Sequence, residues 1–136
     1  MTGAPSTALS LIRVRAATVV AAAAAALAVW AVADPLLGIP LIAQGAPGRP
    51  PMEVGPVPVL AVSVGSALAG WALLALLEGF TARGRTVWTV IAVAVVLLSL
   101  VPVLGGRGTA VQVILASQHV LVGGIVIAGF TRTPGR

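Results

Sequence analysis

The side chain best suited to chemistry in this sequence is His119, the only histidine, which lies within a long apolar stretch. Gln112 lies seven residues before it, and Ala116 and Gly123 flank it at spacings of three and four. In a helix these spacings place all four residues on one face, whereas Gln118 points about 100° away. An imidazole can bind a ligand, accept a proton or join two helices through a hydrogen bond.

The residues that are missing restrict this chemistry. There is no cysteine, which excludes disulfides, thiolate metal sites and cysteine catalysis. The long apolar runs contain no Asp or Glu, so His119 has no carboxylate partner for catalysis or for a metal site with several ligands. We therefore expect no catalytic residue, no metal and no cofactor, and the sequence favours a protein that is not an enzyme.

The composition predicts a membrane protein. Of the 136 residues, 59% are hydrophobic and 8% are charged, whereas soluble domains carry charge on about a quarter of their residues. The net charge of +5 does not indicate a nucleic-acid partner, because the arginines are scattered between the apolar runs. The expected partner is the lipid bilayer, together with a second copy of the chain or another membrane protein.

Four apolar runs are long enough to cross a bilayer, which takes about 20 helical residues. They cover residues 16–33, 57–77, 86–104 and 109–130, and none contains a charged residue. Backbone groups in lipid must be satisfied internally, and the runs lack the alternation of barrel strands, so each is predicted to be a helix. The predicted fold is all-α, an antiparallel bundle of four transmembrane helices in one domain over residues 1–136.

The first run has a second interpretation, as a cleaved signal peptide. Arg13 and Arg15 precede it, and the small residues "AVA" at 31–33 resemble a cleavage site. The run is longer than a usual signal-peptide core, and Trp30 suits an anchor at the membrane interface, so we favour a retained helix.

The arginines predict the orientation. In a four-span arrangement six arginines fall on one side and two on the other. The six are Arg13, Arg15, Arg83, Arg85, Arg132 and Arg136, and the two are Arg49 and Arg107. The positive-inside rule then places both termini in the cytoplasm and the chain in the cell membrane. The proline-rich segment 34–56 is an outer loop, either a connector over the bundle or a lid or partner surface.

Small residues indicate where the helices pack. Gly65 and Ala69 are spaced by four, as are Ser66 and Gly70, and residues 21–26 are all alanine. Since lipid is as apolar as leucine, helices associate through close packing or polar contacts. We expect this face of the second span to pack on the first, and Gly123 to thin the fourth.

Depth estimates place several polar residues near His119. At 1.5 Å per residue, His119 lies about 15 Å below the outer surface and Ser66 about 13.5 Å. These estimates predict a polar column, from the outside inward, of Gln112, Ser99, Ser63, Ser66 and His119. The first interpretation is that a neutral His119 bonds Ser66 or a carbonyl and ties the fourth span to the second. The alternative is a ligand-binding cleft that opens outward and ends at His119.

The sequence resembles a family of small four-helix membrane proteins from actinobacteria whose function is uncharacterised. The matching pieces are "AVWAVA", "SALAGWALLALLE", "LLSLVP" and "QHVLVGGIVI". The resemblance implies a four-helix fold and signature positions at His119, Ser99 and Pro102, but no activity. The leading hypothesis is a non-enzymatic protein that acts through helix packing or a partner. The alternatives are a small-molecule transporter or binder, and a redox subunit that holds haem or quinone.

Overall fold

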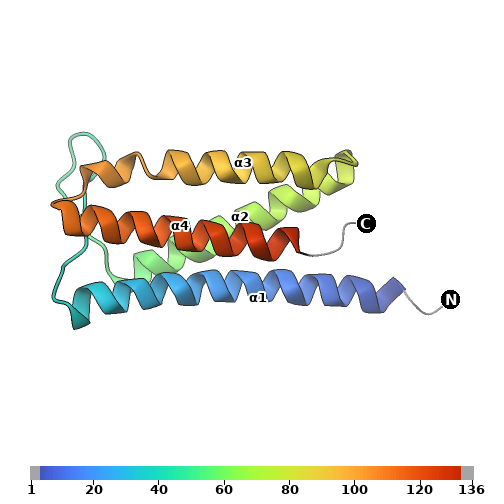
Figure 1. The fold of residues 1–136 in the computed structure, drawn as a ribbon, viewed down its shortest axis with the longest axis horizontal. Helices are drawn as coiled ribbons and strands as arrows, with labels where there is room; N and C mark the ends of the chain where they lie inside the picture. The colour runs from blue at the N-terminus through green and yellow to red at the C-terminus, as the bar shows by residue number, and fades with distance from the viewer. Residues whose placement is uncertain (1–3, 133–136) are drawn as a thin grey trace.

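The computed structural model describes residues 4–132, with side chains from residue 7. It contains four long helices, α1 (Ala4–Ala31), α2 (Pro56–Phe80), α3 (Gly84–Ser99) and α4 (Thr109–Thr131). They lie side by side with alternating direction, and α1 and α3 each pack against both α2 and α4 (Figure 1). The predicted all-α antiparallel four-helix bundle is confirmed.

The two ends of the bundle are named here by what they carry. The start of α1, the short turn between α2 and α3, and the end of α4 lie together at one end, called the arginine end (Figure 1). It holds Arg13, Arg15, Arg83, Arg85 and Arg132. The opposite end, called the loop end, carries the long α1–α2 connection and the α3–α4 turn.

Within the described residues, four helical segments are long and apolar enough to cross a membrane, which indicates a membrane protein. They are Thr7–Leu36, Pro56–Phe80, Gly84–Gly105 and Thr109–Thr131. Many of their large apolar side chains face outward, among them Val62, Leu76, Val90 and Leu98. In water such a surface would drive aggregation, whereas in a bilayer it is the ordinary lipid-facing surface.

The helix boundaries differ from the predicted ones at several ends, most of all at the start of α1 and the end of α3, and α2 runs to Phe80 rather than Leu77. α1 begins at Ala4 rather than at residue 16, and it continues into a π-helical turn, η1 (Val32–Leu36). α3 ends at Ser99 and is followed by a 3₁₀ turn, η2 (Pro102–Gly105), instead of running to Leu104. Proline has no N–H to continue the α-helical ladder, so the chain tightens into bonds between residues three apart.

The α1–α2 connection folds over the loop end and contains a small hairpin that the sequence did not predict. β1 (Ile42–Ala43) pairs antiparallel with β2 (Met52–Glu53). The hairpin is fixed to the bundle at two points. Leu41 is fully buried, and Trp30 of α1 donates its indole N–H to the carbonyl of Val54 at 2.9 Å.

The buried side chains form two clusters, one in each half of the bundle. Val19, Ala67, Leu74, Trp88 and Phe130 pack together toward the arginine end. Ala33, Leu41, Val103, Val111 and Leu115 pack together beneath the loop. The space between α2, α3 and α4 on the loop side of the first cluster is not filled, and the candidate site lies there.

Candidate functional site

A cavity of about 510 Å³ lies between α2, α3 and α4 in the half of the bundle nearer the loop end. It exists because α2 meets α3 at the arginine end and diverges from it toward the loop end (Figure 1). Ala43, Gln44, Met52 and Val54 of the α1–α2 connection line its outer side. Valine is the commonest residue in the remaining lining, which makes the cavity an apolar space with a few polar groups.

The structure brings four of the five predicted polar residues to this cavity. Ser63 and Ser66 reach it from α2, Ser99 from α3 and His119 from α4. Gln112 is not among the lining residues. Its side-chain amide instead donates to the carbonyls of Leu104 and Gly106, at 2.9 and 3.1 Å, and so braces the α3–α4 turn.

His119 does not join two helices, in contrast to the first interpretation of the sequence. Its Nδ1 lies 2.7 Å from the carbonyl oxygen of Leu115, one turn earlier in α4. The two cavity serines with hydrogen bonds behave in the same way. Ser63 donates to Val59 O and Ser99 to Val96 O, each at 2.6 Å and each within its own helix. A polar side chain that bonds its own backbone leaves the facing helix free.

Among the residues that line the cavity, the one whose side chain bonds another helix within the described chain is Gln118, which sequence reasoning did not select. Gln118 is buried, and its amide donates to the carbonyl of Ala26 on α1 at 2.9 Å. The contact requires α1 to be thin at this point, and Ala22 and Ala26 are fully buried there. The sequence could have indicated this contact, because Gln118 is rotated by about 100° from His119 around the helix and so faces a different neighbouring helix.

The predicted packing residues fall into two groups. Gly70 lies against Trp88 and Phe130, and its carbonyl accepts the Trp88 indole N–H at 2.8 Å. Gly123 lies so close to Val96 of α3 that a methyl group would collide with it. The other three, Gly65, Ser66 and Ala69, are exposed, and a methyl group added at Gly65 would meet nothing within 4 Å.

The contact of α2 with α1 therefore uses a different face from the expected one. The buried positions of α2 are Val59, Ser63, Ala67 and Leu74, and they are spaced so that the Gly65 face turns outward. The spacing of small residues alone did not distinguish a face that packs within the chain from one that faces lipid.

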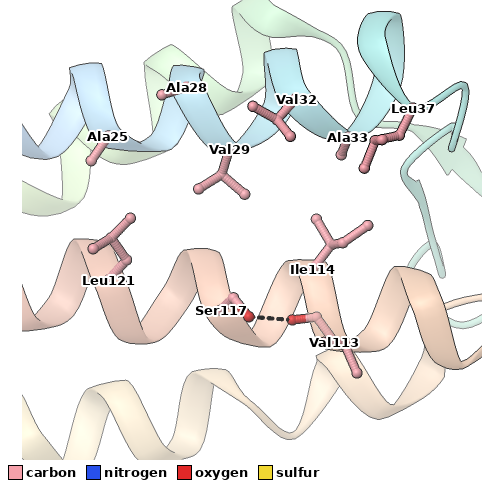
Figure 2. A pocket seen from close by; sticks show the side chains of 10 residues that line it. All are labelled: Ala25, Ala28, Val29, Val32, Ala33, Leu37, Val113, Ile114, Ser117 and Leu121. Atoms are coloured by element: carbon pink, nitrogen blue, oxygen red, sulfur yellow. Dashed lines mark hydrogen bonds between the residues drawn. The ribbon is translucent and has the colours of Figure 1, made fainter.

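A second hollow, of about 360 Å³, lies on the outside of the bundle between α1 and α4. Figure 2 shows Val29 and Ile114 pointing into it from opposite sides. Its one polar side chain, Ser117, donates to Val113 O at 2.7 Å within α4. An apolar groove of this kind suits a lipid acyl chain and offers nothing that would orient a specific ligand.

The arginine end contains a charged network that the site prediction missed. Arg15 of α1 donates to Glu78 of α2 at 2.7 Å, and the two side chains are 4% and 20% exposed. Arg85 of α3 lies 3.5 Å from the other oxygen of Glu78 and donates to the carbonyl of Thr131 on α4 at 3.4 Å. The network thus joins all four helices. The sequence did contain an indication of this network, because Glu78 lies among arginines on one predicted side of the membrane.

No group of three or more His, Asp or Glu residues that could hold a metal ion occurs within the described residues 4–132. Comparison with known proteins gives one finding. A profile described as a family of unknown function (DUF6069) matches residues 6–136. No curated protein and no solved structure matches the chain.

Proposed function

The chain belongs to the family of unknown function DUF6069, so the family suggests no role and the structure must supply one. We propose that the protein is a non-enzymatic membrane protein that binds a small apolar molecule in the cavity between α2, α3 and α4. One observation carries the proposal. Polar side chains from three helices converge on one mostly apolar cavity of about 510 Å³. Small-molecule sites are typically cavities of about 300–1,000 Å³ with apolar walls and a few polar groups that orient the ligand.

The test compares the two hollows of the same protein. Val122→Trp places an indole in the cavity, and Ala28→Trp places the same indole in the α1–α4 groove. The protein in lipid nanodiscs is labelled with a photoreactive long-chain alcohol carrying a diazirine. We expect Val122→Trp to reduce labelling of cavity residues severalfold, while Ala28→Trp leaves it unchanged. Equal labelling in wild type and Val122→Trp would contradict the proposal.

We also propose that the protein lies in the cell membrane with both ends of the chain in the cytoplasm and the hairpin outside. The support is the charge difference between the two ends. The described arginine end has five arginines and one glutamate, whereas the loop end has two arginines, Asp34 and Glu53. All eight basic residues are arginine, and alanine is abundant. This composition supports the actinobacterial origin that the resemblance implied.

Orientation can be measured cleanly because the chain has no cysteine. Ala46→Cys places a thiol in the hairpin loop, and Ala82→Cys places one in the α2–α3 turn. A membrane-impermeant maleimide should label Ala46→Cys in intact cells and Ala82→Cys only after the membrane is opened. The reverse pattern would invert the proposed topology.

Self-association is a second candidate role, which the exposed face of α2 supports. Ala61, Gly65 and Ala69 are exposed and spaced by four, so a second helix could approach the backbone closely. Gly65→Leu should convert a dimer into a monomer in native mass spectrometry from detergent. A wild-type protein that is monomeric at every detergent concentration tested would remove this candidate.

A further inference from the structure

The hydrogen-bond pattern of the cavity carries an inference about its ligand, which rests on the proposed function. We propose that the cavity selects a neutral, lipophilic molecule that donates a hydrogen bond, such as a phenol or an alcohol. It discriminates against anions and against molecules that can only accept. The selectivity arises because several lining side chains already donate their N–H or O–H hydrogen to a backbone carbonyl, which leaves only their acceptor atoms for a ligand.

His119 lines the cavity, and one of its two ring nitrogens is already used within α4. A carbonyl oxygen only accepts hydrogen bonds, so the Nδ1 that lies 2.7 Å from Leu115 O carries the ring hydrogen. In the neutral imidazole the other nitrogen, Nε2, then has no hydrogen and acts as an acceptor. Within the described chain Nε2 makes no hydrogen bond, and it is not sealed off as a buried atom. A ligand can therefore meet this atom only with a donor.

Ser63 and Ser99 present acceptors for the same reason. Each hydroxyl has one hydrogen, and each hydrogen is used on a carbonyl of its own helix, Val59 O and Val96 O, at 2.6 Å. What remains is the lone pairs of the two oxygens, which accept. Three helices thus each supply one side chain whose hydrogen is turned back on its own backbone.

Three other polar lining residues, Ser66, Gln44 and Gln118, are less selective, and the Gln44 amide, which can donate and accept, makes no hydrogen bond within the described chain. Ser66 makes no hydrogen bond within the described chain, so its hydroxyl can donate or accept. Gln118 uses its amide nitrogen on Ala26 O, and its side-chain carbonyl oxygen makes no hydrogen bond within residues 4–132. Ser66 and Gln44 add donors, whereas the free oxygen of Gln118 accepts, so acceptors outnumber donors among the side chains that the three helices supply.

The distribution of charge excludes ionic ligands. No Arg, Asp or Glu lines the cavity, so neither a phosphate nor a carboxylate would find a cation, and an ammonium would find no carboxylate. A charged group without a partner in an apolar site loses its hydration without compensation. A quinone, which only accepts, would meet mostly lone pairs, whereas the hydroxyls of a phenol would be matched.

The test uses two probes that differ in a single hydrogen-bond donor, para-hexylphenol and its methyl ether, para-hexylanisole. Each competes with the photoreactive alcohol for labelling of the full-length protein in nanodiscs, and empty nanodiscs correct for partition into lipid. One neutral hydrogen bond contributes about 1 kcal/mol, so the phenol should compete about fivefold better than the ether. His119→Leu should abolish this preference and leave competition by the ether unchanged.

The ligand pair keeps the inference testable even if His119→Leu does not fold, and Ser63→Ala and Ser99→Ala should each reduce the preference by less. If the ether competes as well as the phenol while Val122→Trp blocks both, the ligand class is wrong and the proposed function stands. If Val122→Trp blocks neither, the binding function itself fails. A phenol preference that survives in His119→Leu would assign the selectivity to another group and overturn the role given to His119.

Discussion

The charged and indole side chains at the arginine end and the side chains that line the cavity near the loop end make different kinds of contact. At the arginine end Arg15, Glu78 and Arg85 join neighbouring helices, and Arg85 reaches the backbone of α4. Trp88 of α3 donates its indole N–H to the carbonyl of Gly70 on α2. The centroid of its ring lies 5.6 Å from that of Phe130 on α4. Each of these contacts crosses from one helix to another.

At the loop end most of the cavity side chains return to their own helices. Ser63, Ser99 and His119 bond carbonyls three or four residues earlier, and Gln118 is the cavity residue that crosses to α1. Here the helices diverge and leave a cavity. The comparison indicates that the charged network at the arginine end joins all four helices, whereas the cavity near the loop end keeps polar groups available to a ligand.

The largest expected effect is on the ion pair at the arginine end. Glu78→Gln leaves Arg15, whose side chain is 4% exposed, as a buried cation without its counter-ion. Breaking a buried pair costs about 3–5 kcal/mol, and we expect about 3 because the Glu78 side chain retains 20% exposure. The free energy of unfolding, measured by steric trapping in bicelles, checks this value.

Two variants control the experiment. Glu53→Gln makes the same change on an exposed residue at the loop end and should alter stability by less than about 0.5 kcal/mol. Arg15→Met combined with Glu78→Gln removes both charges and should be more stable than Glu78→Gln alone. Equal losses in Glu78→Gln and Glu53→Gln would remove the contrast between the two ends.

The next effect concerns close packing of α4 on α1. A methyl group at Gly129 would collide with the side chain of Thr18, which is itself held by a bond to Val14 O at 2.9 Å. Gly129→Ala should therefore destabilise by about 2 kcal/mol, as overpacking does. Gly124, five residues earlier on the same helix, has open space around it. Gly124→Ala should be neutral or slightly stabilising in the same measurement, and an equal loss in both variants would contradict the packing argument.

The fold could be predicted from the sequence because a bilayer leaves few alternatives. An apolar run of about 20 residues without charge must satisfy its backbone internally, and this requirement produces the four helices in the observed arrangement. The predicted span 86–104 falls within the helical segment Gly84–Gly105, but the sequence did not predict that the α-helix ends at Ser99. The structure shows that the chain changes to a 3₁₀ turn at Pro102. The short hairpin was not predictable, since strands of two residues leave no periodic signal.

The candidate site could be predicted only in part. The estimated depths of the polar residues in the membrane led to five candidates, and four of them line one cavity: Ser63, Ser66, Ser99 and His119. Depth does not give the rotation of each helix, so it could not show that Gln112 braces a turn or that Gly65 faces outward. Nor could it show whether a hydroxyl bonds its own backbone or a neighbour. That choice depends on the distance to the facing helix.

A smaller effect is expected at the loop end, where Gln118 joins α4 to α1. Gln118→Leu removes the bond to Ala26 O and keeps a side chain of similar size. Side-chain hydrogen bonds between membrane helices average about 0.6 kcal/mol, and we expect a loss of this order. Ser117→Ala on the adjacent position removes a bond within α4 only and should cost less. If Gln118→Leu lowered the free energy of unfolding more than Glu78→Gln does, the strongest contact between helices would lie at the loop end.

The smallest effect is expected for the cavity serines. Ser63→Ala and Ser99→Ala each remove a hydroxyl that bonds its own helix, and a bond of this kind contributes little to helix stability. Both variants should unfold within about 0.5 kcal/mol of the wild type, because alanine is also the better helix former. If Ser63→Ala instead cost as much as Gln118→Leu, its hydroxyl would be a structural group. The polar lining of the cavity would then be explained by folding, without any ligand.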